Sequence, residues 1–331
     1  MHKGDFLVVN YGHLGDAALS FVFNQNLKRF FPDCNIFSIV SKSNIEFFEK
    51  FDSSLSKVFL YDENYGFKDD SLKSLNINTV IFLRGVLKKT YCDIFTLLKK
   101  IFPKATFIGM IKEEDDEKEP FDECYLEREK NISILKQIFN FVKFLTGKQE
   151  IIIPRITIKY DYALKDNIIK KFDNNNPIIY VNLSAGNKKN IWDYIRRNLS
   201  AKKYYKLIKI LSNKKYNIIT TSSLEDCKKA KFIKDSFKEF KNFMFLDTNT
   251  ISELVFCINS SDVIVSPETA VVHIASLLNK PIVGLYISKK RITEWPPFSE
   301  KFRCVLPKFE GYLNNIKIEE IIKNIDVLLN D

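Results

Sequence analysis

The sequence predicts an α/β protein built from two successive halves, each with a parallel β-sheet. Short apolar runs typical of buried strands alternate with longer segments that have apolar residues at helical spacing, and this alternation is typical of parallel sheets. Two of the apolar runs, at 5–10 and 177–182, are each followed by a glycine-bearing turn, so the pattern begins twice. Between them, residues 151–162 are predicted to be extended and include a proline. We therefore expect an N-terminal domain at 1–155 and a C-terminal domain at 156–331.

The elements of each half follow from apolar runs, helix caps and helix-breaking residues. In the first half we expect strands at 5–10, 35–40, 57–60, 78–83 and 106–110, and helices at 16–30, 43–51, 96–102 and 132–145. Pro32 and Gly147 end the first and the last of these helices. In the second half we expect strands at 177–182, 216–221, 243–246, 263–265 and from 282, and helices at 202–211, 225–237, 251–258, 267–278 and 318–329.

The composition limits the partners and the cellular setting. The chain of 331 residues is 45% hydrophobic and carries a formal net charge of +10, which suits anionic partners, although drift in composition explains it equally well. We expect no nucleic acid partner because no nucleic-acid-binding signature is visible. The six cysteines form no Cys-x-x-Cys pair, which argues against a metal site and favours a reducing compartment. We find neither a signal peptide nor an apolar run of about 20 residues, so we expect a cytoplasmic protein.

The strongest candidate site follows the strand at 263–265. Ser266 is a predicted N-cap, Pro267 suits the first helical position and Glu268 lies in the first turn. A helix that begins at the carboxyl end of a parallel strand offers free N–H groups, which favour anions such as phosphate.

This arrangement makes Glu268, Thr269 and His273 candidate ligand-binding residues. The alternative is an ordinary capped helix, in which Glu268 interacts with the helix dipole and His273 packs in the core.

Other turns offer further polar groups. The turn Tyr11-Gly12-His13-Leu14-Gly15-Asp16 places a carboxylate at a predicted helix start. Asp16 can act there as a general base, or it can stabilise the helix through a favourable interaction with the helix dipole. The turn after residue 182 contains Ser184, Gly186, Lys188 and Lys189, with Arg196 and Arg197 beyond it, and suits a diphosphate or forms a solvated basic loop. The turn after residue 221 contains Glu225, which can bind ribose hydroxyls or cap the next helix.

Three ordered motifs resemble the ADP-heptose–lipopolysaccharide heptosyltransferases of glycosyltransferase family 9. The first is the buried strand and turn that end in Leu14-Gly15-Asp16. The second is the strand and turn Asn182-Leu183-Ser184-Ala185-Gly186, followed by a helix with Tyr204, Leu207 and Ile208. The third is Glu268-Thr269-Ala270-Val271-Val272-His273 before a Lys-Pro strand, where the family has Asp-Thr-Gly-x-x-His. Three motifs in order are more specific than any one of them.

The resemblance implies a GT-B fold, with two Rossmann-like domains whose parallel sheets face one another across a cleft. It also implies an inverting, metal-independent sugar transfer from an ADP-sugar, without a cofactor. Asp16 would be the general base, and Gly12, His13 and Gly15 would lie on the acceptor side.

For the donor, the resemblance implies that the start of the helix at Thr269 and Ala270, with Ser184, meets the diphosphate. A cation among Lys188, Lys189, Arg196 and Arg197 would assist. Glu225 would bind the ribose, Glu268 the transferred sugar, and the adenine would lie against the segment around Asn249. His273 completes the donor motif.

The acceptor implied by the resemblance is a lipid-linked saccharide at the inner face of the membrane. Basic, aromatic stretches at 28–31, 88–91 and 99–102 suit peripheral contact with an anionic surface. Each stretch is equally well explained as the end of an amphipathic helix.

Two residues depart from the family motif. Glu268 replaces an aspartate and is one methylene longer, and Ala270 replaces a glycine, so its methyl group limits close approach of a phosphate. The departures leave two alternatives to transfer: a non-catalytic member that binds a nucleotide sugar, and a GT-B-like sugar-nucleotide epimerase.

Overall fold

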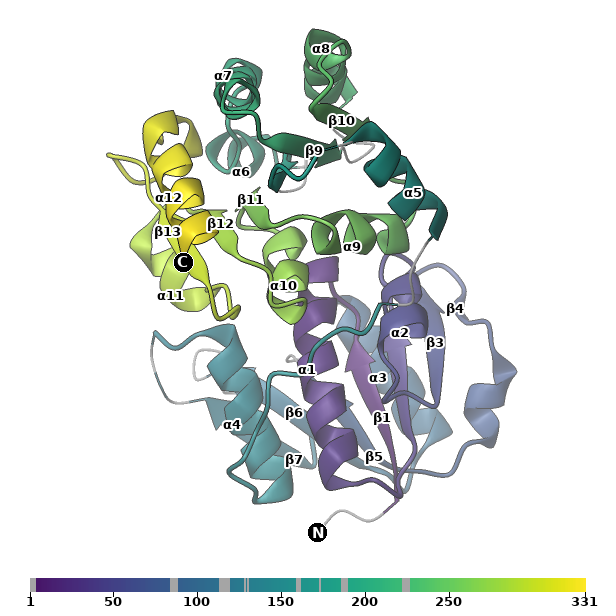
Figure 1. Cartoon of the computed structure of the whole chain (residues 1–331). Coiled ribbons are helices and arrows are strands. Elements are labelled where there is room, and N and C mark those ends of the chain that lie inside the picture. The colour runs from purple at the N-terminus through teal and green to yellow at the C-terminus, as the bar shows by residue number, and fades with distance from the viewer. Residues whose placement is uncertain are drawn as a thin grey trace. The chain divides into compact units, whose positions relative to one another are not determined.

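The computed structural model describes residues 4–83, 89–112, 120–127, 129, 131–158, 162–172, 174–185, 190–221 and 227–331. The chain divides into two compact units, Met1–Pro154 and Arg155–Asp331 (Figure 1). Lys188, Lys189 and Glu225, three of the predicted donor residues, lie outside the described residues.

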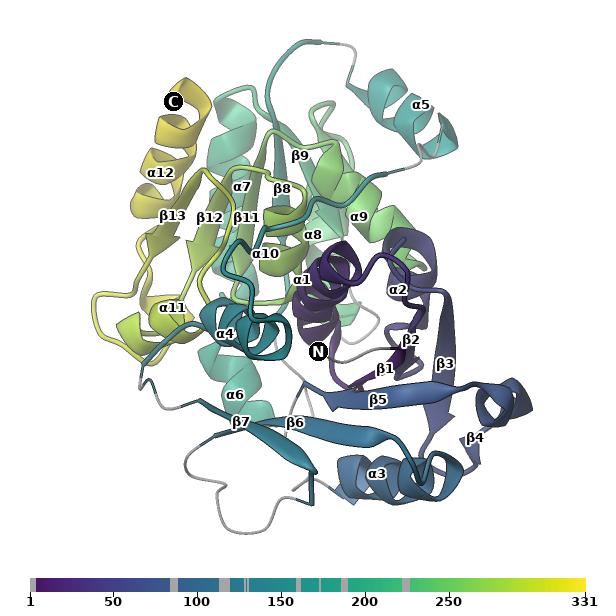
Figure 2. The same cartoon turned by 90° about the horizontal axis from the view of Figure 1, so that it is seen from below.

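The first unit contains a sheet in the order β4-β3-β2-β1-β5-β6-β7, parallel throughout except for the short β4. The strands are β1 (Asp5–Asn10), β2 (Ile36–Val40), β3 (Lys57–Asp62), β4 (Gly66–Phe67), β5 (Ile77–Phe82), β6 (Thr106–Lys112) and β7 (Glu123–Glu127). The helices are α1 (Leu14–Phe30), α2 (Ile45–Phe51), η1 (Asp70–Ser74, a 3₁₀ helix), α3 (Lys89–Ile101) and α4 (Ile134–Thr146). Figure 2 shows α3 on one face of this sheet and α1, α2 and α4 on the other. The central strand β1 is almost fully buried because both of its neighbours are parallel strands and both faces are covered.

The second unit contains a fully parallel sheet in the order β10-β9-β8-β11-β12-β13. The strands are β8 (Ile178–Asn182), β9 (Asn217–Thr221), β10 (Phe243–Leu246), β11 (Val263–Pro267), β12 (Ile282–Leu285) and β13 (Phe302–Val305). The helices are α5 (Tyr162–Lys171), α6 (Ile191–Arg196), α7 (Ala201–Asn213), α8 (Cys227–Phe237), α9 (Ile251–Asn259), α10 (Ala270–Leu277), α11 (Lys289–Glu294), η4 (Leu313–Asn315, a 3₁₀ helix) and α12 (Ile318–Asn330). Numbered within this unit, the strand order is 3-2-1-4-5-6, which is the doubly wound order of a dinucleotide-binding sheet.

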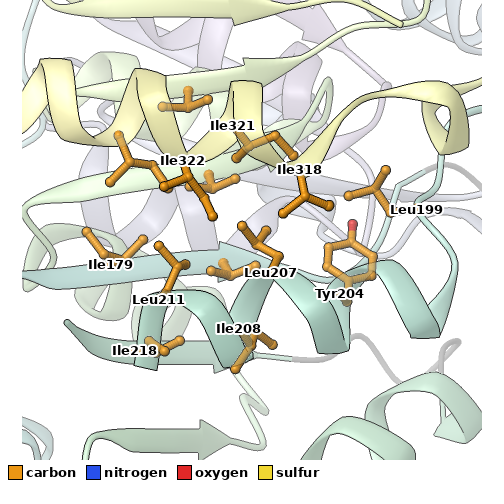
Figure 3. Packing of buried hydrophobic residues seen from close by; sticks show 14 of the residues in the cluster. Ile179, Leu199, Tyr204, Leu207, Ile208, Leu211, Ile218, Ile318, Ile321 and Ile322 are labelled. Atoms are coloured by element: carbon orange, nitrogen blue, oxygen red, sulfur yellow. The ribbon is translucent and has the colours of Figure 1, made fainter. Parts of the chain in front are cut away.

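One face of the second sheet is covered by an apolar layer from α7 and α12. Figure 3 shows Leu207 and Leu211 of α7 and Ile321 and Ile322 of α12 pointing toward one another over the sheet. Leu207 and Leu211 are four residues apart, and Ile318 precedes Ile321 and Ile322 by three and four residues, so these side chains lie on one side of each helix, as the predicted amphipathic pattern requires. This layer fixes the helices that flank the strands, and so holds the turns at the ends of the strands in place.

Three predicted helix starts are wrong. The helix expected at 96–102 begins at Lys89 in the structure, seven residues earlier. Asp16 does not open the first helix, because α1 begins at Leu14 and Asp16 is the third residue of its first turn. Ser266 is not an N-cap, because β11 continues through Pro267 and pairs Ser266 with Gly284 of the next strand. Thr269 caps α10 instead: its backbone is extended and its hydroxyl accepts a hydrogen bond from the N–H of Val271.

The described helices include none that is both long and apolar enough to cross a membrane.

Asp52 gives a pH-dependent test of the first unit. Its carboxylate is buried at the end of α2 and accepts hydrogen bonds from Asn24, Gln25 and Ser54. Burial outweighs these donors and raises the pKa of Asp52 to about 6. The folded state therefore holds the proton more tightly than the unfolded state, and this stabilisation is complete below the unfolded pKa of 3.8 and is lost as the pH rises through about 6.

We expect Asp52→Asn to remove that slope, which is on the order of 3 kcal/mol between pH 4 and 7. The measurement is the free energy of unfolding by urea as a function of pH for both proteins. Identical slopes in the wild type and in Asp52→Asn would contradict the assignment.

Candidate functional site

The strand order of the second unit places a candidate site at the carboxyl ends of β8 and β11. These neighbouring strands are where the order reverses, because the chain moves outward from β8 to β10 on one side and from β11 to β13 on the other. Ligands of doubly wound sheets bind in the crevice outside such a reversal point. The turns that follow the two strands contain Ser184 and Glu268 respectively.

A buried asparagine joins these two turns. The side-chain amide of Asn182, the last residue of β8, donates to the carbonyl oxygen of Ser184 at 3.0 Å, to Oγ of Ser266 at 3.0 Å and to Oγ1 of Thr269 at 3.2 Å. The N–H of Ser184 donates in return to Oδ1 of Asn182 at 3.4 Å. One side chain therefore fixes the turn after β8 against the cap of α10.

Glu268 lies between two arginines from different turns. Oε1 of Glu268 is 3.4 Å from Nη2 of Arg197, just after α6, and Oε2 is 2.9 Å from Nη2 of Arg291 in α11. Nε of Arg291 also donates to Oε2 at 3.1 Å. The side chain of Glu268 is 11% exposed, whereas those of Arg197 and Arg291 are 17% and 31% exposed. The residues Asn182, Ser184, Arg197, Glu268, Thr269 and Arg291 are called the switch-point cluster below.

The charges of this cluster alternate. Arg197 contacts Asp193 at 3.3 Å in addition to Glu268, and Arg291 contacts Glu294 at 3.5 Å. Burial nevertheless raises the pKa of the Glu268 carboxyl above its usual value, while the two arginines counteract that shift. The half-buried guanidinium group of Arg197 beside the start of α10 can meet an anionic ligand, and the carboxylate between the two arginines can accept hydrogen bonds from hydroxyl groups.

The other predicted donor residues of this unit lie in different settings. Ala270 is the first residue of α10 and is half-buried beside the Thr269 cap. His273 is 2% exposed, with its ring stacked on Phe298 and tilted against Trp295, a position that favours the core interpretation. Asn249 is exposed before α9, and its N–H donates to the carboxylate of Glu253.

The structure separates the two candidate arginines for the diphosphate. Nε of Arg196 donates to the carbonyl oxygen of Gly311, whereas Arg197 belongs to the switch-point cluster. Of these two, Arg197 is therefore beside the start of α10.

In the first unit, Asp16 is held against a glycine turn. Its Oδ2 accepts a hydrogen bond from the N–H of His13 at 2.9 Å, and a Cβ on Gly12 would lie 2.7 Å from the same oxygen. The carbonyl oxygen of Gly12 accepts from Oγ of Ser41 and from Nδ2 of Asn44. Glycine at position 12 is thus required by the close approach of the carboxylate. Gly15 is the second residue of α1 and is half-buried, and the side chain of His13 is exposed.

Sequence reasoning missed Arg291 and the joining role of Asn182. Arg291 follows the turn after β12, and it meets Glu268 because β12 pairs directly with β11. The signal in the sequence was a charged side chain, Arg291, soon after the strand that follows β11 in the chain. This signal predicts a contact with Glu268 only when the strand order is known. Asn182 ends an apolar strand with a polar group, and that change was visible in the sequence.

The comparisons with known proteins agree with this fold. A family model described as glycosyltransferase family 9 (heptosyltransferase) matches residues 129–325, which is more than half of the chain. No curated protein sequence matches the chain significantly.

Three solved structures illustrate the similarity. E. coli ADP-heptose lps heptosyltransferase II is 16% identical, with a TM-score of 0.78 over 98% of this chain and 98% of that chain. E. coli heptosyltransferase WaaC with ADP is 11% identical, with a TM-score of 0.70 over 98% and 99%. The UDP-GlcNAc 2-epimerase of Methanocaldococcus jannaschii is 13% identical, with a TM-score of 0.57 over 99% and 93%. Identities this low show a shared fold, which is the GT-B fold that the family resemblance implies.

Asn182 provides a test of the switch-point cluster that needs no ligand. We expect Asn182→Ala to lower the free energy of unfolding by about 1–3 kcal/mol, because it leaves the buried hydroxyl of Ser266 and part-buried partners in two turns without this donor. The measurement is urea unfolding, with Asn249→Ala as the control at an exposed position. Equal stability of the two variants would show that Asn182 does not join the turns.

Proposed function

The chain belongs to glycosyltransferase family 9, the heptosyltransferase family, and from this premise we propose that it transfers a heptose or related sugar from an ADP-sugar to a lipopolysaccharide or lipo-oligosaccharide core acceptor. Family membership makes the protein a glycosyltransferase, as the sequence motifs predicted. The donor is inferred from the related structures, one of which is described with ADP.

The observation that carries the proposal is the switch-point cluster. The half-buried start of α10 and Arg197 lie at the reversal point of a doubly wound sheet, where they offer N–H groups and a positive charge to a diphosphate. Glu268 lies beside them with a carboxylate for sugar hydroxyls. By the family resemblance, Asn249 would contact the adenine and Glu225 the ribose.

The proposed reaction inverts the configuration at the anomeric carbon. Asp16 accepts the proton of the acceptor hydroxyl while the oxygen of that hydroxyl forms a bond to the anomeric carbon. The bond from that carbon to the phosphate oxygen breaks through an oxocarbenium-like transition state, and the electron pair leaves with ADP. The N–H groups of α10 and the guanidinium of Arg197 stabilise the charge that grows on the diphosphate, so the proposal requires no metal and no cofactor.

The acceptor places the proposed reaction in the cytoplasm at the inner face of the membrane. Membrane contact through the basic, aromatic stretches has little support from their burial, since Tyr91 and Phe102 are 4% and 6% exposed. These two aromatic residues belong to the core, which favours the explanation that the stretches at 88–91 and 99–102 are parts of amphipathic helices; Lys88 lies outside the described residues.

Mass spectrometry of the products tests the transfer. Purified protein is incubated with ADP-heptose and a heptose-deficient lipid acceptor, and we expect the mass of one heptose to be added to the acceptor. Asp16→Asn should transfer at least about 100-fold more slowly, since a general base contributes that much. Asp33→Asn, an exposed aspartate after the same helix, is the matched control and should transfer like the wild type.

The other outcomes separate the alternatives. Conversion of the donor without any acceptor would favour an epimerase, and binding without turnover would favour a non-catalytic member. Loss of transfer in EDTA that Mg²⁺ restores would contradict the metal-independent mechanism. Unchanged transfer by Asp16→Asn would contradict the assigned base.

A further inference from the structure

Arg291 reaches the switch-point cluster from a turn outside the family motifs. It lies in α11, whose N-cap Ser288 accepts a hydrogen bond from the N–H of Arg291 at 3.3 Å. The preceding strand β12 pairs with β11 in register, with Leu285 opposite Pro267. The two turns therefore leave the sheet side by side, and this brings Arg291 to Glu268.

Arg291 and Arg197 contact different oxygens of the Glu268 carboxylate. Nε and Nη2 of Arg291 both approach Oε2 of Glu268, at 3.1 and 2.9 Å, while Arg197 approaches Oε1 from the other turn. Each oxygen of the carboxylate thus has its own guanidinium. A glutamate side chain has one more rotatable bond than an aspartate, so a fixed orientation at this position requires an external anchor.

We infer that Arg291 is a positioning residue that orients the Glu268 carboxylate toward the hydroxyl groups of the transferred sugar. The inference rests on the proposed function and adds the means by which the longer glutamate is used in this chain. A carboxylate has about four lone-pair positions, and the arginines leave some of them for sugar hydroxyls.

The surrounding charges fit this role. Glu268 is 11% exposed, and a carboxylate so far removed from water is costly without a paired charge. Arg291 is 31% exposed and is also paired with Glu294 at the end of its own helix, which fixes the guanidinium from a second side. Among the residues that the structure describes, removing Arg291 would leave the Glu268 carboxylate paired with Arg197, at the longer distance of 3.4 Å.

The experiment compares two ligands by isothermal titration calorimetry. ADP contains the diphosphate but lacks the sugar, whereas ADP-heptose contains both. We expect Arg291→Gln to weaken ADP-heptose binding at least about 10-fold and ADP binding less than about 2-fold. Arg291→Lys keeps the charge without the fork of donors, and should recover part of the lost affinity for ADP-heptose.

Lys290→Gln is the matched control, because its exposed side chain contacts Glu294 but not Glu268, and it should bind both ligands like the wild type. In transfer assays, Arg291→Gln should raise the KM for the donor more than it lowers kcat. Arg291→Lys also keeps the test open if Arg291→Gln does not fold.

The results that would contradict this inference differ from those that would contradict the proposed function. If the wild type binds neither ligand, the proposed donor is wrong. If the wild type binds both but Arg291→Gln weakens ADP and ADP-heptose equally, or weakens neither, Arg291 does not act on the sugar and the proposed function is unaffected. Arg291→Lys binding ADP-heptose as weakly as Arg291→Gln would show that the positive charge has no part in the effect.

Discussion

The ion pairs between Glu268 and two arginines connect three segments that follow the carboxyl ends of strands in the second sheet. Arg197 comes from the segment after β8, Glu268 follows β11, and Arg291 follows β12. These turns are neighbours only because β11 lies between β8 and β12. The candidate site therefore depends on the strand order, and the hydrogen bonds of the buried Asn182 side chain hold the first two of these turns at a fixed distance.

Much of the fold could be predicted because buried parallel strands appear in a sequence as uninterrupted apolar runs. The runs at β1 and β8 are clear examples, and Gly147 ends α4 as predicted, in the left-handed conformation. The start of α10 was misplaced because Ser-Pro-Glu is a good local capping pattern, whereas strand pairing keeps Ser266 and Pro267 in β11. Tertiary pairing overrode a local preference there.

Part of the candidate site could be predicted from the positions of residues relative to the strands. Glu268, Thr269 and Ser184 follow the carboxyl ends of strands, and a parallel sheet brings these ends together on one side. Arg291 could not be predicted, because the sequence does not specify that β12 lies next to β11. The sequence also left Arg196 and Arg197 as alternatives, and the structure distinguishes them through their partners, Gly311 and Glu268. The burial of His273 similarly required the packing of Phe298 and Trp295.

The central claim is that the diphosphate of a nucleotide sugar binds at the switch-point cluster. The most direct measurement is amide hydrogen exchange of the full chain with and without saturating ADP. We predict slower exchange at residues 183–185 and 270–272, the turn after β8 and the first turn of α10, with no change along α12. Unchanged exchange at both segments, or protection confined to other parts of the chain, would contradict the account.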